Sequence, residues 1–328
     1  MKYRKLGKTG MHVSEVSLGT WQVGGGWGGS FDRKAASDII HEAIDQGINF
    51  IDTADVYDAG MSEAVVGKII RQRNEEVFVA TKCGRQIQPH TAEGYTPQVL
   101  RGYVEASLKN MNLESIDLIQ LHCPPTEVYH RPEIFGLFED LKKEGKIQNM
   151  GVSVEKVEEA IFALDYQNVT TVQIIFNMFR LKPSEEFFSL AKAKDSGIIV
   201  RVPLASGLLA GKIDESTRFH PEDHRNFNRE GKAFDKGETF SGIDLDQGVQ
   251  AVKELKALFG DKAPLAALAI RWVLMFEEVS TVIPGASKPD QVKANVEAAS
   301  LAPLTGKEMD TVADIYNKYF KAEIHEKW

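Results

Sequence analysis

Residues 50–57 read Phe50-Ile51-Asp52-Thr53-Ala54-Asp55-Val56-Tyr57, an apolar run that ends in a carboxylate and is followed five positions later by a tyrosine. Two further apolar runs, Phe78 to Lys82 and Leu118 to His122, each end in one titratable side chain. Short runs of this kind are typical of strands that are buried on both faces of a parallel sheet. In a barrel of parallel strands the carboxyl ends share one face, where active sites are built. We therefore expect Asp52, Tyr57, Lys82 and His122 to meet on that face.

These four side chains suit the transfer of a proton to an oxygen atom. Tyrosine has an ordinary pKa of about 10, so Tyr57 can act as an acid only if a neighbour stabilises its phenolate. Lys82 would supply the positive charge, and Asp52 would keep the buried lysine protonated. His122 would orient a carbonyl oxygen by hydrogen bonding. A proton delivered to oxygen while a hydride reaches the adjacent carbon requires a nicotinamide cofactor, which predicts carbonyl reduction.

Apolar runs alternate with amphipathic segments along the chain, a pattern that predicts repeated units of one strand and one helix. The length of 328 residues suits an α/β fold of the (β/α)8 or TIM-barrel type, and we expect one domain over residues 1–328. Residues 205–245 lack periodicity and follow the seventh strand, so they are expected to fold over the cofactor. The eight expected strands are 16–20, 49–54, 77–82, 116–122, 150–154, 172–177, 198–204 and 279–284.

Charge and hydropathy exclude several classes of protein. The chain has 39 Lys and Arg against 47 Asp and Glu, a formal charge of -8, and no long basic run. Nucleic acid is therefore not an expected partner. Apolar stretches fall short of the ~20 residues that span a bilayer, and the first residues are polar where a signal peptide needs an apolar core. We expect a cytoplasmic monomer, because a closed barrel has no unpaired edge that demands self-association.

The chain resembles the aldo-keto reductase superfamily from Tyr3 to the last expected helix. Besides the four residues above, which match the family's catalytic tetrad, the motifs occur in the family's order and spacing. They are Leu18-Gly19-Thr20-Trp21, Gly151-Val152-Ser153, Pro203 to Lys212 and Ile283 to Pro289. Within the superfamily the chain is most similar to bacterial reductases of the inositol-operon, general-stress-protein-like type. The resemblance implies a barrel with extra C-terminal helices, whose bottom is plugged by a hairpin formed by residues 2–13.

The resemblance also implies an NADP(H) site. Barrels commonly bind phosphate after strands seven and eight. Ser206 and neighbouring amides would hold the pyrophosphate, while Ser153 and Gln173 would hold the carboxamide. Ser287 and Lys288 open a helix, and a helix N-terminus suits the additional phosphate of NADP(H). The expected cofactor contacts are Gly19, Thr20, Trp21, Asp52, Ser153, Gln173, Arg201, Pro203, Leu204, Ser206, Gly207, Leu209, Gly211, Lys212, Gly285, Ser287, Lys288, Gln291 and Asn295.

The expected substrate is an aldehyde or ketone, including sugar-derived and other polar carbonyl compounds. The expected pocket walls are Trp21, Trp27, Tyr57 and His122. Arg201 stands where the family commonly stacks a tyrosine on the nicotinamide, and it would place charge and donors near the ring. Val154 replaces a common asparagine, and Asp58 replaces the glycine that often follows the catalytic tyrosine.

Several alternatives remain at the level of sequence. Gly24 to Gly29 satisfies the G-x-G-x-x-G pattern of dinucleotide-binding turns, although the strand-to-helix spacing is loose on both sides and favours an ordinary loop. Lys82 could instead form a Schiff base in an aldolase or lyase. The chain could also be a nucleotide-binding subunit with little turnover, as in channel-associated members of the superfamily.

No metal site is expected. His220 and His224 have an H-x-x-x-H spacing, but the surrounding sequence is that of a solvated loop. Cys83 and Cys123 each follow a predicted catalytic residue. Because adjacent strand residues point to opposite faces, both thiols are expected to be reduced and to face the helices.

Overall fold

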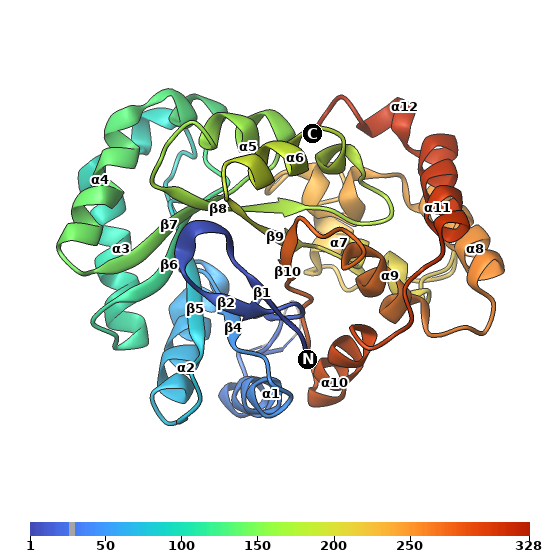
Figure 1. Ribbon diagram of the computed structural model, residues 1–328, viewed down its shortest axis with the longest axis horizontal. Coiled ribbons are helices and arrows are strands. Elements are labelled where there is room, and N and C mark those ends of the chain that lie inside the picture. Colours follow the sequence, from blue (N-terminus) through green and yellow to red (C-terminus); the bar gives the residue numbers. More distant parts are fainter. Residues whose placement is uncertain (26–29) are drawn as a thin grey trace.

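Eight parallel strands form a closed barrel in the computed structural model, which describes residues 1–25 and 30–328 (Figure 1). The strands follow one another around the sheet in chain order. The ring closes because Val16 pairs with Val282 and Gly19 pairs with Gly285. All eight predicted strands are present, with shifted bounds. They are β3 (Leu18–Gly19), β4 (Phe50–Asp52), β5 (Phe78–Cys83), β6 (Ile116–His122), β7 (Ile147–Ser153), β8 (Val169–Ile175), β9 (Gly197–Arg201) and β10 (Val279–Val282).

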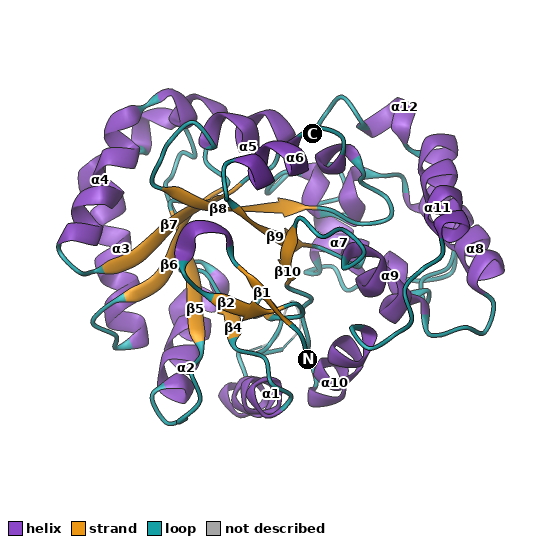
Figure 2. Ribbon diagram, in the orientation of Figure 1, coloured by secondary structure: helices purple, strands orange, loops and turns teal. Residues whose placement is uncertain are grey.

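Helices surround the barrel (Figure 2). Several begin at residues whose side chains accept hydrogen bonds from the first amides, among them Asp32, Thr96 and Asp244. The helices are α1 (Arg33–Asp45), α2 (Met61–Ile70), α3 (Pro97–Met111), α4 (Pro132–Lys143), α5 (Val157–Ala163), α6 (Phe187–Ala193), α7 (His224–Phe227), α8 (Leu245–Phe259), α9 (Leu265–Val273), α10 (Pro289–Ala298), α11 (Gly306–Tyr319) and α12 (Lys321–Ile324). None of the described helices is both long and apolar enough to cross a membrane.

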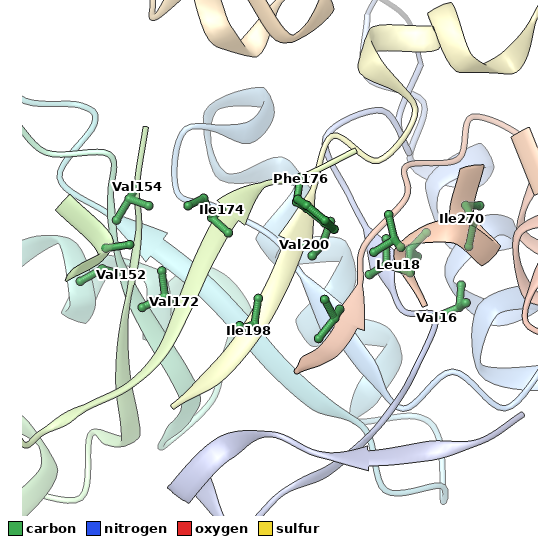
Figure 3. Packing of buried hydrophobic residues seen from close by; sticks show 14 of the residues in the cluster. Val16, Leu18, Val152, Val154, Val172, Ile174, Phe176, Ile198, Val200 and Ile270 are labelled. Atoms are coloured by element: carbon green, nitrogen blue, oxygen red, sulfur yellow. The ribbon is translucent and has the colours of Figure 1, made fainter. Parts of the chain in front are cut away.

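The outer faces of the strands are apolar and pack against these helices. Val152, Val172 and Ile198 lie in a row on neighbouring strands β7, β8 and β9 (Figure 3). Each is fully buried in the main hydrophobic cluster of the molecule. Removing this apolar surface from water is the main stabilising contribution to the barrel.

The inner faces of the strands change from apolar to polar along the barrel. Phe50, Ala80, Leu118 and Ile199 form a small apolar cluster inside it. Strand side chains alternate between faces, so the residues two positions further along point to the same interior. Those residues are Asp52, Lys82, Gln120 and Arg201. The barrel is therefore apolar toward the start of its strands and polar toward their carboxyl ends.

A two-stranded hairpin lies across the end where the strands start. Strands β1 (Tyr3–Lys5) and β2 (His12–Ser14) pair antiparallel, and they cross in front of the barrel in Figure 1. Leu6, Met11 and Val13 belong to the same apolar cluster as the inner residues of the barrel. The Arg4 guanidinium donates hydrogen bonds to the backbone oxygens of Leu274, Phe276 and Val279. The hairpin thus covers the apolar layer and leaves the polar layer facing the opposite end.

The segment between β9 and α8 is long and mostly irregular. It begins abruptly, because Val202 has a φ of 54° and ends the strand three residues before the sequence predicts. The segment contains short 3-10 turns and α7. Trp328 packs against it, donating a hydrogen bond from Nε1 to Asp235 Oδ1 at 2.8 Å. The C-terminal residue therefore helps to hold this segment in place.

We expect Gly67 to be required for the packing of α2 against α3. A Cβ atom at Gly67 would collide with the backbone of Met111, reaching 2.5 Å from its Cα atom. Gly67→Ala should lower the free energy of unfolding by about 1–3 kcal/mol. Gly102→Ala is the matched control, because no described atom lies within 4 Å of the added methyl group. This control should be neutral or stabilising by up to about 1 kcal/mol. Equal urea-unfolding midpoints for the two variants would contradict the packing.

Candidate active site

Lys82 lies at the centre of the polar layer. Its ammonium group donates hydrogen bonds to Asp52 Oδ2 at 2.5 Å, to the Thr53 carbonyl oxygen at 2.8 Å and to Tyr57 Oη at 3.2 Å. Lys82 is 1% exposed and Asp52 is 2% exposed. A buried charge is tolerated only when it is paired and hydrogen-bonded, and the three acceptors meet that requirement. Three of the four predicted residues are therefore joined through one ammonium group.

Asp52 is held from its other side by two glutamines. Gln173 Nε2 donates to Asp52 Oδ1 at 2.8 Å, and Gln120 Nε2 donates to the same oxygen at 3.1 Å. Gln173 was expected at the cofactor, and here its amide nitrogen is engaged with Asp52. Gln120 was missed by the sequence reasoning. The available signal was its position two residues before His122, which places both side chains on the same face of β6.

Tyr57 follows β4 and enters a tight turn. Asp58 and Ala59 have φ angles of 49° and 53°, and Gly60 follows with 83°. Residues other than glycine in this left-handed region are strained, and such strain often occurs at functional sites. The glycine that the family often places after the tyrosine would relieve it at Asp58. The Tyr57 ring lies between Trp21 and His122, with ring centroids 6.4 and 6.1 Å away.

The protonation states follow from burial and neighbouring charge. Burial opposes the charged form of Lys82, but Asp52 and Tyr57 outweigh it and raise the lysine pKa above its ordinary value. Burial raises the pKa of Tyr57, while Lys82 acts in the opposite direction. Burial, together with the charges of Arg85 and Lys82, lowers the pKa of His122 well below its ordinary value. At neutral pH the site thus contains an ammonium group, a protonated phenol and a neutral imidazole.

This arrangement can hold a carbonyl oxygen and give it a proton. His122 Nδ1 is buried and has no hydrogen-bond partner among the residues that the structure describes. A neutral imidazole can donate one hydrogen bond, and Tyr57 can donate a second. Loss of the Tyr57 proton would leave a phenolate beside the Lys82 ammonium group. The donor set therefore fits a reaction in which negative charge develops on oxygen.

The predicted carboxamide and pyrophosphate contacts lie around this centre. Ser153 ends β7, and its hydroxyl lies 3.5 Å from Cys123 Sγ. Thr20 donates from its hydroxyl to the backbone oxygen of Asp52 at 3.1 Å. Ser206 donates to the Glu238 carbonyl oxygen and accepts from the Phe240 amide. Its hydroxyl thus joins the start of the segment between β9 and α8 to the part of the same segment around Glu238 and Phe240.

Most of the expected contacts after β9 lie in or beside one turn. It is a 3-10 turn, Ala205–Ala210, and positive φ angles at Ser206 and Gly207 bend its backbone. Leu209 is buried within it, whereas Lys212 beyond it is exposed. These expected residues are Pro203, Leu204, Ser206, Gly207, Leu209, Gly211 and Lys212, and Gly285 follows β10 beside Gly19.

The start of α10 has the chemistry of a phosphate site. The side chains of Ser287 and Lys288 are exposed there, and Lys288 occupies the N-cap without a side-chain capping bond among the described residues. Ser287 contacts Gln291 Oε1 through both its amide and its hydroxyl, and Asn295 donates to the Gly285 carbonyl oxygen. The Lys288 ammonium group at a helix N-terminus fits an anionic phosphate, and the Ser287 amide and hydroxyl would have to exchange Gln291 for it.

One face of the expected substrate pocket is aromatic. Trp21 lies 4.9 Å from the ring of His224 and 6.3 Å from that of Phe234, both in the segment after β9. His224 is buried and His220 is exposed, so the H-x-x-x-H spacing does not bring the two histidines into one environment. Trp27 lies outside the described residues.

A charged group beside His122 was largely missed by the sequence reasoning. Arg201, which was expected near the nicotinamide, ends β9, and its Nη2 donates to Glu155 Oε2 at 3.0 Å and to the Val154 carbonyl oxygen at 3.0 Å. Arg85 and Glu238 join the same group.

Cys123 also faces this charged group, so the expectation that its thiol faces the helices is wrong. The reason is that β6 ends at His122 and Cys123 has a φ of 47°, which breaks the strand alternation. Cys83, by contrast, lies in the main apolar cluster.

The chain belongs to the Aldo/keto reductase family, whose model matches residues 15–317. This agrees with the barrel of eight parallel strands. A barrel with this family's pattern excludes the open sheet that the glycine-rich stretch could have suggested.

Three known proteins illustrate what the chain is similar to. It is 31% identical to the NADH-specific methylglyoxal reductase of Escherichia coli, over 92% of this chain and 94% of the relative. Its structure is similar to that of the holo form of the aldo-keto reductase AKR11C1 from Bacillus halodurans, with a TM-score of 0.77, 29% identity and 96% coverage of both chains. It is also similar to the glycerol dehydrogenase AKR11B4 from Gluconobacter oxydans, with a TM-score of 0.76, 28% identity and 97% and 96% coverage.

The buried carboxyl of Asp55 predicts a pH dependence of stability. Burial, reinforced by the charge of Glu63, raises the pKa of Asp55 to about 7. Between the unfolded pKa near 4 and this value the folded protein binds more protons than the unfolded chain, so stability falls as pH rises through that window. Asp55→Asn should remove this decrease in the free energy of unfolding, which is on the order of 2–4 kcal/mol between pH 4 and pH 8. Urea unfolding at several pH values measures it, and parallel pH profiles for both proteins would contradict the buried carboxyl.

Proposed function

We propose that this chain is an NADPH-dependent reductase of aldehydes and ketones in which Tyr57 is the general acid. The observation that carries the proposal is the position of the Lys82 ammonium group, which contacts Asp52 and Tyr57 at once. Membership of the Aldo/keto reductase family supports oxidoreductase chemistry in general. The contact between Lys82 and Tyr57 is the reason why the proposal gives the proton-transfer role to Tyr57.

The proposed mechanism assigns one task to each residue. His122 and Tyr57 hold the carbonyl oxygen of the substrate. A nicotinamide nucleotide, when bound, would supply the hydride. Tyr57 gives its proton to the oxygen, and the Lys82 ammonium group, 3.2 Å from Oη, stabilises the phenolate that remains. Asp52 keeps Lys82 protonated throughout the reaction. In the reverse reaction, the oxidation of an alcohol, the same groups would take a proton from the hydroxyl group of the substrate.

The preference for NADP(H) is proposed from the residues at the start of α10. Lys288 and Ser287 are exposed there and could bind the phosphate that distinguishes NADP(H) from NAD(H). The E. coli relative is named as specific for NADH, so similarity to the family alone does not decide the cofactor. The chemistry of this chain's own donor set is the reason for the proposal.

The substrate is proposed to be a polar carbonyl compound, including sugar-derived ones. The expected pocket includes the aromatic ring of Trp21, and the charged side chain of Arg201 contacts Cys123, which directly follows His122. An aromatic face and polar groups suit a hydroxylated compound. One structural neighbour is named as a glycerol dehydrogenase, which agrees with this class of compound.

A Schiff-base role for Lys82 is disfavoured by its surroundings. A nucleophilic lysine must be neutral, which requires a lowered pKa. Burial does oppose the charge of Lys82, but Asp52 and Tyr57 raise the pKa of this lysine instead. Borohydride treatment with substrate should therefore leave Lys82 unmodified.

The direct test is the oxidation of NADPH by the purified protein with a panel of aldehydes, ketones and oxidised sugars, repeated with NADH. Wild type should turn over, with a lower KM for NADPH than for NADH. Tyr57→Phe keeps the ring and removes the proton, so kcat should fall by at least about 100-fold. The affinity for NADPH, measured from the quenching of tryptophan fluorescence, should be unchanged in the variant. Tight NADPH binding without turnover by the wild type would instead favour a nucleotide-binding subunit.

A further inference from the structure

Four charged residues, three of them buried and Arg85 partly buried, form a cluster beside the tetrad, which we call the charged cluster: Arg85, Glu155, Arg201 and Glu238. Arg85 follows β5, Glu155 follows β7, and Arg201 ends β9. Glu238 comes from the long segment between β9 and α8. Glu155 and Arg201 are each 9% exposed and Glu238 is 7% exposed, so this is not a solvated surface network.

Both guanidinium groups converge on one oxygen atom of Glu238. Arg85 Nη1 lies 2.7 Å from Glu238 Oε1, and Arg201 Nη1 lies 3.6 Å from the same atom. Glu155 pairs with the same two arginines, with its Oε2 3.0 Å from Arg201 Nη2 and its Oε1 3.8 Å from Arg85 Nη2. Two arginines directed at one carboxylate are the usual arrangement of a site that binds an anionic ligand. In this chain the carboxylate belongs to the protein.

The two carboxyl groups do not have the same charge. Burial, together with the charge of Glu238, raises the pKa of Glu155 to about 8. Burial also opposes the charge of Glu238, but Arg85 and Arg201 outweigh it and hold the pKa of Glu238 below its ordinary value. At neutral pH Glu238 is therefore the anion of the charged cluster, and Glu155 is mostly neutral. Without Glu238 the two guanidinium groups would keep Glu155 as the one carboxyl group of the cluster, so two positive charges would face at most one negative charge.

The charged cluster adjoins the place where a substrate would bind. Arg201 Nη2 contacts Cys123 Sγ, and Cys123 directly follows His122. Arg85, Cys123, Glu155 and Phe234 are among the residues that line one cavity of about 390 Å³. The Arg85 guanidinium lies 5.7 Å from the centre of the Phe234 ring. A group attached to a bound carbonyl compound could thus extend toward the arginines.

A metal ion is a poor alternative occupant. Ligand atoms of Cys123, Glu155 and Glu238 do lie within 4.8 Å of one another. The two guanidinium groups already supply positive charge there, and they bind the carboxylate oxygens that a metal would need. The charged cluster is therefore suited to an anion and not to a cation.

The backbone around Glu238 is held independently of its side chain. Ser206 Oγ bonds to the Glu238 carbonyl oxygen and to the Phe240 amide, and Trp328 bonds to Asp235. Trp328 also stacks against Arg180, whose guanidinium lies 4.8 Å from the ring centre. Shortening the Glu238 side chain should therefore open a space between the arginines without releasing the segment.

We propose that Glu238 is a specificity-determining residue that occupies a two-arginine carboxylate site beside the catalytic centre. While it is present, the enzyme discriminates against carbonyl substrates that carry a carboxylate. Once its side chain is removed, Arg85 and Arg201 bind a carboxylate from solution or from the substrate. The substrate part of the proposal rests on the proposed reductase function, whereas the anion site does not.

The anion site is tested without any enzyme activity. Sodium formate should raise the melting temperature of Glu238→Ala by several degrees, because it fills the vacated site, with sodium chloride as the ionic-strength control. Wild type and the double variant Arg85→Ala/Glu238→Ala should show no formate-specific rise. Equal responses of all three proteins would overturn the proposal.

Substrate selection is tested with succinic semialdehyde and its neutral methyl ester. The ratio of kcat/KM for the acid to that for the ester should rise by about tenfold or more from wild type to Glu238→Ala, equivalent to about 1.4 kcal/mol. Glu238→Gln removes the charge at nearly constant volume and should shift the ratio in the same direction, which provides a test if the alanine variant folds poorly. An unchanged ratio in an active variant would refute the specificity role. If wild type reduces no carbonyl compound, the reductase proposal fails, while the formate experiment still decides the anion site.

Discussion

The burial of the Lys82 ammonium group is the constraint on which the rest of the site depends. A cation removed from water is stable only if its hydrogen bonds are replaced, and Asp52, the Thr53 carbonyl oxygen and Tyr57 replace them. Gln120 and Gln173 then fix Asp52 from its other side. Movement of any of these groups would leave a charge or a donor unsatisfied in the interior. The hydrogen bonds that stabilise the buried Lys82 ammonium group thus also position Tyr57.

The fold tolerates this buried polar group because the barrel separates an apolar layer from a polar layer. Phe50, Ala80, Leu118 and Ile199 fill the interior toward the start of the strands, where the hairpin of β1 and β2 covers them. Two residues further along each strand the interior becomes polar. The apolar outer faces and their helices supply the stability of the fold, so the polar layer is free to serve binding and chemistry.

The features that could be predicted from the sequence are those that depend on the local pattern of apolar and polar residues. Strand positions followed from short apolar runs, and the joint location of Asp52, Tyr57 and Lys82 followed from their places at strand ends. What was missed depends on contacts between distant segments or on backbone bends. Glu238 reaches Arg85 across 153 positions of the chain, and no local pattern marks that pair. Cys123 was misplaced because a single positive φ angle reverses the side of the strand on which it lies. Gln120 was predictable in principle, since it shares a strand face with His122.

The central claim is that Asp52 acts through Lys82 to support proton transfer by Tyr57. The most direct measurement is a double-mutant cycle in kcat/KM with Asp52→Asn, Lys82→Met and the double variant, each checked for native circular dichroism. If Asp52 acts through Lys82, the double variant should be no slower than Lys82→Met alone, within about threefold. If the two losses multiply, Asp52 and Lys82 act independently and the claim is wrong.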